Sequence, residues 1–97
     1  MKKNGEKMTL KERHEAVHAA IMDGPNAQLQ EWIDSGTAWM LEGHVGRTAM
    51  AALRDGAAVL PPESHHDYYG NTVPSYLDVA DEIGSPGSVA NAEAYDD

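Results

Sequence analysis

The sequence has no cysteine and no phenylalanine among its 97 residues, and it contains only two tryptophans and four tyrosines. Without cysteine the chain cannot form the disulfides that stabilise many small secreted domains, whose hydrophobic cores are small. We therefore expect a protein of the cytoplasm, where thiols stay reduced. Its core must be built from aliphatic side chains, methionine and the two indole rings.

Long hydrophobic runs are also missing. No stretch of the sequence approaches the roughly 20 apolar residues that a membrane-spanning helix requires. Lys2 and Lys3 are followed by polar residues, at the place where a signal peptide would have its hydrophobic segment. We therefore expect neither insertion into a membrane nor export.

Lysine and arginine are absent from residue 55 onward. Seven lysines and arginines stand against sixteen acidic residues, which gives a net charge of -9, and all seven lie at or before Arg54. The acidic half repels phosphate backbones unless a basic partner meets it. This charge pattern disfavours direct binding to nucleic acid.

The first helix is predicted by a capping pattern. Thr9 and Glu12 stand at the spacing of a capping box, in which each side chain accepts a hydrogen bond from a backbone amide at the start of the helix. The helix should run over 10–22, because Gly24 can take the left-handed cap and Pro25 cannot continue the ladder. Its apolar stripe, at helical spacing, consists of Leu10, His14, Val17 and Ile21.

Two further helices are predicted in the first half. A short one covers 26–35 and is closed by Gly36, and a third runs from a threonine cap over 37–54. Gly43 and Gly46 lie inside the third pattern. Because glycine weakens a helix interior, the pair marks either a break or a close approach between helices. The residues expected to face the core from this helix are Leu41, Val45, Ala49, Ala52 and Leu53, flanked by Trp39 and Met50.

The second half predicts a little β structure and then a tail. Residues 57–60 form a short apolar run that suits a brief strand, and 72–79 suits a second, so that the two would make a hairpin packed on the helices. Residues 1–8 should be flexible, and 81–97 should be a mobile acidic tail because they contain too few apolar residues. The predicted fold is mainly α, with one three-helix domain over 9–80 and a short hairpin.

The segment 14–18, His-Glu-Ala-Val-His, matches the H-E-x-x-H pattern of zinc peptidases. Two histidines one helical turn apart can share a tetrahedral Zn²⁺, while the glutamate acts on the zinc-bound water. The chain here resembles the zincins, and the resemblance implies zinc at His14 and His18 with Glu15 as general base. The other candidate ligands are Glu31, Asp34, Glu42, His44, His65 and His66.

None of these candidates stands at a spacing that the zincins use for their third ligand. On a polar helix, His14 and His18 are more simply explained as solvated or half-buried side chains without a metal. We therefore keep a minimal zinc hydrolase as an alternative hypothesis only.

The segment 43–46, Gly-His-Val-Gly, is similar to the GxxG loop of KH domains, which clamps a nucleotide backbone. Arg47 and Arg54 follow it, and the resemblance implies binding to RNA or DNA. However, Glu42 stands where KH proteins usually have an apolar residue, and the acidic balance opposes contact with phosphates. We favour the interpretation that the glycines allow helices to approach closely.

A loop rich in histidine and tyrosine is predicted between the two strands. It contains His65, His66, Asp67, Tyr68 and Tyr69. Aromatic side chains in loops offer contact area for a partner. We take these five residues as the candidate binding site. In the other interpretation the tyrosine rings lie on the helices while the histidines stay in water.

Three segments, 39–47, 67–71 and 73–75, carry a further resemblance over roughly the central half of the chain. Together they resemble small proteins of bacteriophages that infect actinobacteria, a group with no established activity. The resemblance implies a phage accessory or regulatory protein that binds a host or phage protein in the bacterial cytoplasm, and it transfers no site residues. Protein binding is therefore the leading hypothesis, without a cofactor, ahead of the zinc hydrolase and the KH-like nucleic-acid binder.

Overall fold

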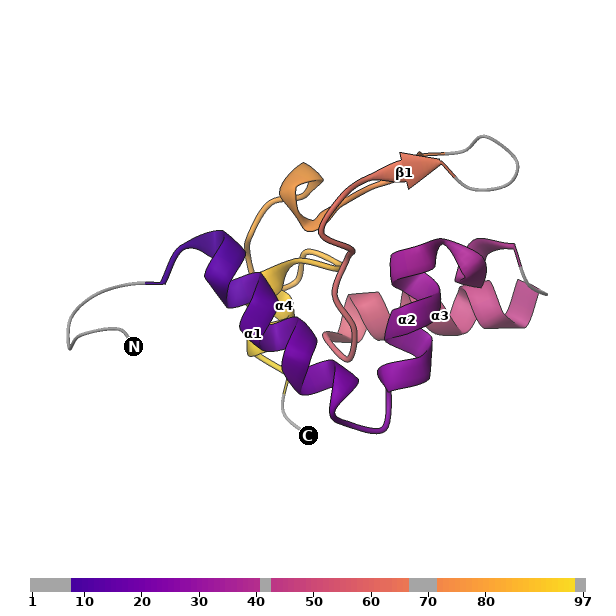
Figure 1. Ribbon diagram of the computed structural model, residues 1–97, viewed down its shortest axis with the longest axis horizontal. Coiled ribbons are helices and arrows are strands. Elements are labelled where there is room, and N and C mark those ends of the chain that lie inside the picture. The colour runs from indigo at the N-terminus through magenta and orange to yellow at the C-terminus, as the bar shows by residue number, and fades with distance from the viewer. Residues whose placement is uncertain (1–7, 41–42, 67–71, 96–97) are drawn as a thin grey trace.

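The computed structural model describes residues 8–40, 43–66 and 72–95 (Figure 1). Within these ranges the chain forms four α-helices, two short 3-10 helices and one two-stranded antiparallel sheet. The prediction of a mainly helical fold with a small hairpin is therefore confirmed.

Helix α1 spans Leu10–Met22, as predicted, and it begins at the predicted capping box. The amide of Glu12 donates to Thr9 Oγ1 over 3.1 Å, and the amide of Thr9 donates to Glu12 Oε1 over 2.8 Å. The left-handed cap predicted at Gly24 is wrong, because this glycine does not have a positive φ. Pro25 is enough to stop the helical ladder, since it has no amide hydrogen to donate.

Helix α2 spans Ala27–Ser35 and closes at Gly36, as predicted. Gly36 has a φ of 83°, the left-handed conformation that glycine adopts with little strain. Ile33 is fully buried, and Leu29 and Trp32 pack against the core, so these three residues form the apolar face of α2. A short turn links α1 to α2, and the two helices contact each other.

The third predicted helix is divided into two elements. A 3-10 helix, η1, spans Thr37–Trp39, and helix α3 spans Gly43–Asp55. The prediction of one helix over 37–54 is wrong because the left-handed Gly36 redirects the chain into the tighter turn of η1. From its first residue α3 is continuous, so that Gly43 and Gly46 lie in its first turn and do not break it.

The segment 57–60 is largely buried, but it is not a strand. The carbonyl and amide of Val59 bond to the side chain of Gln30 over 2.8 and 2.9 Å. The amide of Leu60 donates to the carbonyl of Gly87 over 3.0 Å. The predicted strand is therefore wrong, because side chains and a distant loop satisfy the backbone groups that a neighbouring strand would otherwise satisfy.

The sheet pairs β1 (His65–His66) with β2 (Thr72–Val73) in antiparallel register. The predicted strand over 72–79 is wrong beyond its second residue. Ser75 begins a capping box for the 3-10 helix η2 (Tyr76–Asp78), so the chain leaves the extended conformation there.

The mobile tail predicted over 81–97 is wrong for its described residues, which extend to 95. Helix α4 spans Val89–Glu93, and the side chain of Val89 is 1% exposed in the core. Asn91 Nδ2 donates to the carbonyls of Leu53 and Arg54 over 3.1 and 3.0 Å. The described part of the tail therefore satisfies carbonyls at the end of α3 and belongs to the domain, which does not stop at residue 80.

Arg13 of α1 forms ion pairs with the described part of this C-terminal segment. It donates to Glu93 over 2.6 Å and to Asp81 over 2.8 Å. Hydrogen bonds to Glu93 and Asp81 raise the pKa of Arg13. These contacts cross most of the chain length, which explains how a segment of low hydrophobicity becomes ordered.

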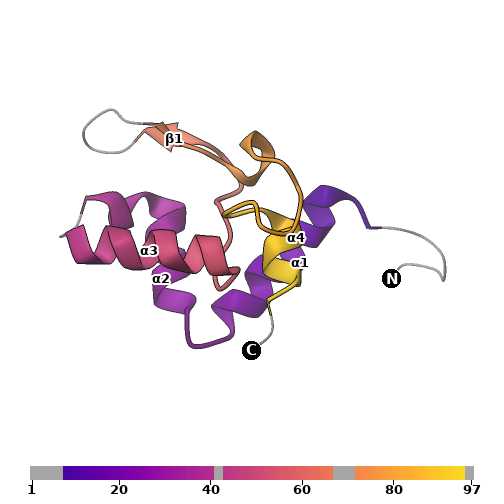
Figure 2. The same ribbon diagram turned by 180° about the vertical axis from the view of Figure 1, so that it is seen from behind.

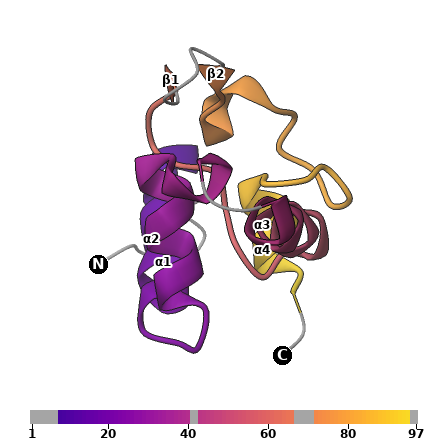
Figure 3. The same ribbon diagram turned by 90° about the vertical axis from the view of Figure 1, so that its right-hand side faces the viewer.

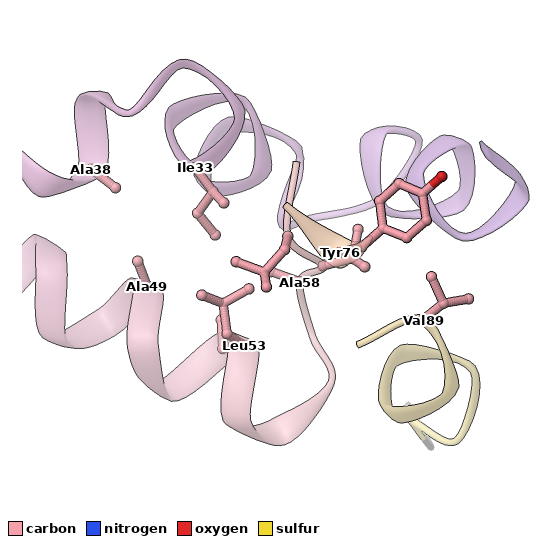
Figure 4. Close-up of a cluster of buried hydrophobic side chains, with 10 residues drawn as sticks. Ile33, Ala38, Ala49, Leu53, Ala58, Tyr76 and Val89 are labelled. Carbon is pink, nitrogen blue, oxygen red and sulfur yellow. The ribbon is translucent and has the colours of Figure 1, made fainter. Parts of the chain in front are cut away.

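The hydrophobic core joins the two halves of the chain. Figure 3 shows α1 and α2 side by side, with α3 and α4 opposite them and the hairpin above. In Figure 4 side chains from α2, α3, α4 and 57–60 point into one shared interior. Of the residues expected to face inward from the third helix, Ala49, Ala52 and Leu53 are buried, Val45 is half-buried and Leu41 lies outside the described residues.

Candidate functional site

His14 is a buried structural histidine in this fold. Its side chain is 3% exposed, deeper than the solvated or half-buried position expected from sequence. Its Nε2 lies 2.8 Å from the carbonyl oxygen of Leu60, which can only accept, so this nitrogen carries the proton. The ring stacks on Tyr76 at 4.0 Å and on His18 at 5.7 Å between centroids. Burial lowers the pKa of His14, which keeps the imidazole neutral near pH 7.

His18 is engaged with a different partner. Its Nε2 lies 2.5 Å from Asp34 Oδ2, while Asp34 Oδ1 accepts from Gln30 Nε2 at 2.9 Å. Because Gln30 also bonds to Val59, the histidine pair belongs to a network that links α1, α2 and the buried segment 57–60.

The zincin ligand set is not assembled among the described residues, in which no group of three His, Asp or Glu side chains is placed to share a metal ion. His14 Nε2 and His18 Nε2 bond to separate partners, and Glu15 is exposed. Of the predicted third ligands, Asp34 forms a hydrogen bond with His18. His18, Asp34 and His65 all line one hollow of about 310 Å³. Glu31, His44 and His66 are exposed, and Glu42 lies outside the described residues.

The GxxG segment does not form a loop between two helices. Its residues, 43–46, are the first turn of α3, and the sheet that the structure describes has only two strands. The KH arrangement implied by the sequence is therefore not present in the described part of the chain.

The predicted binding loop is only partly described. His65 is half-buried, and its ring lies against Gly36, where an added Cβ would stand 2.7 Å from His65 Nε2. His66 is exposed. Asp67, Tyr68 and Tyr69 lie outside the described residues, so binding through this loop stays a prediction.

Sequence reasoning missed a groove beside α3. At 3.6 residues per turn, Gly43, Arg47, Met50 and Arg54 fall on one outward stripe. Figure 2 shows α3 with no other described element crossing in front of it. The hollow measures about 460 Å³. We call it the α3 groove; its lining residues are Trp39, Gly43, Gly46, Arg47, Met50 and Arg54.

The groove combines an apolar floor with two arginine side chains. Met50 is 44% exposed, and Trp39 is half-buried, with no hydrogen-bond partner for its indole Nε1 among the described residues. Within the described residues neither Arg47 nor Arg54 forms an ion pair, in contrast to Arg13. The spacing of Arg47, Met50 and Arg54 was readable in the sequence. The approach of Trp39 was not, because it depends on the turn into η1.

A second hollow, of about 290 Å³, lies between α1, the turn that follows it and α4. Its lining includes Val17, Ile21, Ala57 and Tyr95, and none of its lining residues is charged. It therefore offers apolar contact but little that would select one ligand over another.

The fold and the α3 groove together define a small helical protein with one basic, partly apolar groove on an acidic chain. No helix among the described residues is long and apolar enough to cross a membrane. Comparisons with protein-family models, with curated proteins and with solved structures found no match.

Proposed function

We propose that this protein acts by binding another protein, and that the α3 groove is the contact surface. The composition of the groove carries the proposal. Tryptophan, methionine and arginine are enriched at protein interfaces, and Trp and Arg dominate the binding energy of many of them. Here Trp39 of η1 lies beside Arg47, Met50 and Arg54 of α3, and the two arginines form no ion pair among the described residues.

The two alternatives, a zinc hydrolase and a KH-like nucleic-acid binder, have less support. Zinc binding through His14 Nε2 would require this nitrogen to give up its bond to the Leu60 carbonyl and leave that buried acceptor unsatisfied. Nucleic-acid binding would rest on two groove arginines in a chain of net charge -9. Protein binding requires neither change, and it agrees with the accessory or regulatory role in a bacterial host that the phage resemblance implies.

Site-specific photo-crosslinking tests the proposal. A benzoylphenylalanine placed at Met50 of the full chain should yield a discrete protein adduct in an actinobacterial lysate. The matched control is the same residue at Met22, which is 38% exposed on α1 and does not line the groove. Combining Arg47→Ala and Arg54→Ala in the Met50 crosslinking variant should remove the adduct. Equal labelling from both positions, or none from Met50, would refute the proposal.

A further inference from the structure

The spacing of charges along the α3 groove indicates what kind of segment would occupy it. Arg47 and Arg54 are seven residues apart on one helix, which places them about 10 Å apart along its axis, with Met50 between them. Resting on the proposed function, we infer that the occupant is an acidic amphipathic helix of the partner protein. It carries two carboxylates two turns apart and an apolar side chain between them.

The positive charge of the groove acts over a short range. Arg13 forms ion pairs with Glu93 and Asp81, whereas the two groove arginines have no ion-pair partner among the described residues. Asp55 is exposed, but it lies about 100° around α3 from Arg54. Screening at physiological ionic strength limits exposed charges to a range of about 8 Å, so the net charge of the whole chain does not cancel this attraction.

The glycines explain why a helix, rather than side chains alone, fits the groove. Gly43 and Gly46 both line the groove at the start of α3, where Gly43 is exposed and Gly46 is half-buried. A Cβ added at Gly46 would meet only the carbonyl of Ala38 at 3.7 Å and the Trp39 ring at 4.0 Å, which are ordinary contacts. The methyl group would therefore lie between α3 and η1, against the Trp39 ring that lines the groove. An amphipathic helix that lays its apolar face in a groove is a recurrent mode of recognition.

Gly46→Ala separates recognition from folding. Alanine fits without strain and favours a helix more than glycine does, so the variant should be at least as stable as the parent. The added methyl lies against the Trp39 ring and changes the apolar floor of the groove, so it should weaken binding by about fivefold or more. A purely structural glycine would not give these opposite changes.

Trp39 provides the reporter, because the chain has only one other tryptophan. In a Trp32→Phe background, the full chain is titrated with an alanine-rich helical peptide that has two glutamates seven residues apart and leucine midway. Binding should change the Trp39 fluorescence. Arg47→Ala and Arg54→Ala should each weaken peptide binding by about three- to tenfold. Lys11→Ala, which removes the same charge from an exposed site on α1, should leave the affinity for the peptide unchanged.

Four results would overturn the inference. The first is equal binding by a peptide with glutamine in place of glutamate. The second is competition by a single-stranded oligonucleotide that depends on Arg47, which would make the occupant a nucleic acid. The third is a Trp39 signal that changes with dilution of the protein alone and is lost in Arg47→Ala, which would make the occupant a second copy. If Met50 crosslinks to a partner through a segment that is not acidic, this inference fails while the proposed function stands.

Discussion

Gln30 is the side chain on which the buried segment 57–60 most depends. It is 0% exposed, and its amide group bonds to both backbone polar groups of Val59, which is also fully buried. A third bond, to Asp34, reaches a partly exposed carboxylate that water can reach. Gln30→Met keeps most of the side-chain volume but removes all three bonds, so it isolates the contribution of the hydrogen bonds.

The expected cost follows from the groups left unpaired. A buried donor or acceptor without a partner costs about 1 to 3 kcal/mol, and Gln30→Met leaves the amide and the carbonyl of Val59 in that state. The free energy of unfolding should therefore fall by about 2 to 6 kcal/mol. Because small domains are stable by only about 5 to 15 kcal/mol, the loss is large enough to measure easily.

Urea unfolding followed by far-UV circular dichroism measures this change, with the urea dependence of the free energy expected to stay the same. Gln28→Met is the matched control on the same helix. Gln28 is exposed and donates only to Glu31, over 3.0 Å, so its replacement should cost less than about 0.5 kcal/mol. Equal midpoints for the two variants would refute the reasoning, because Val59 would then have other partners.

Three further predictions concern the histidines and α4. Burial lowers the pKa of His14, so at acidic pH the unfolded chain binds a proton that the folded chain excludes. The free energy of unfolding should therefore fall as the pH drops below about 6.5. Between pH 8 and 5, the urea midpoint of His14→Gln should fall less steeply than that of the parent protein. Val89→Ala should lower the free energy of unfolding by about 1.5 to 3 kcal/mol, whereas an unchanged melting temperature would mean that α4 is not docked. The dialysed protein should hold no stoichiometric zinc by elemental analysis; one zinc per chain that disappears in His14→Ala, with peptidase activity lost in Glu15→Gln, would instead establish the hydrolase.

The H-E-x-x-H pattern shows why a short motif does not decide chemistry. The sequence places His14 and His18 on one face of a helix, and the structure agrees, because their rings stack. What the pattern does not contain is the carbonyl of Leu60 and the carboxylate of Asp34, which occupy the two Nε2 atoms. The same spacing that suits a zinc ion therefore also suits a hydrogen-bonded connection between helices.

The α3 groove shows the opposite case. Its outward stripe of Arg47, Met50 and Arg54 follows from helical periodicity alone, once α3 is known to be continuous. Its depth does not, because the wall formed by Trp39 requires the chain to turn back at Gly36 and form η1. The candidate loop at His65 was selected on residue type, and only its first two residues are described.

The sequence by itself determined the elements whose causes lie within a turn or two of the chain. The capping box at Thr9 and Glu12 begins α1, and Gly36 closes α2, because the groups involved are three or fewer residues apart. Tertiary structure decided what local pattern could not. Val59 avoids a strand because Gln30, 29 residues earlier, satisfies its backbone. Val89 is ordered because the core and the ion pairs of Arg13 hold its segment in place. Such contacts form only when segments far apart in the sequence pack together, and hydrophobic periodicity does not predict which segments do so.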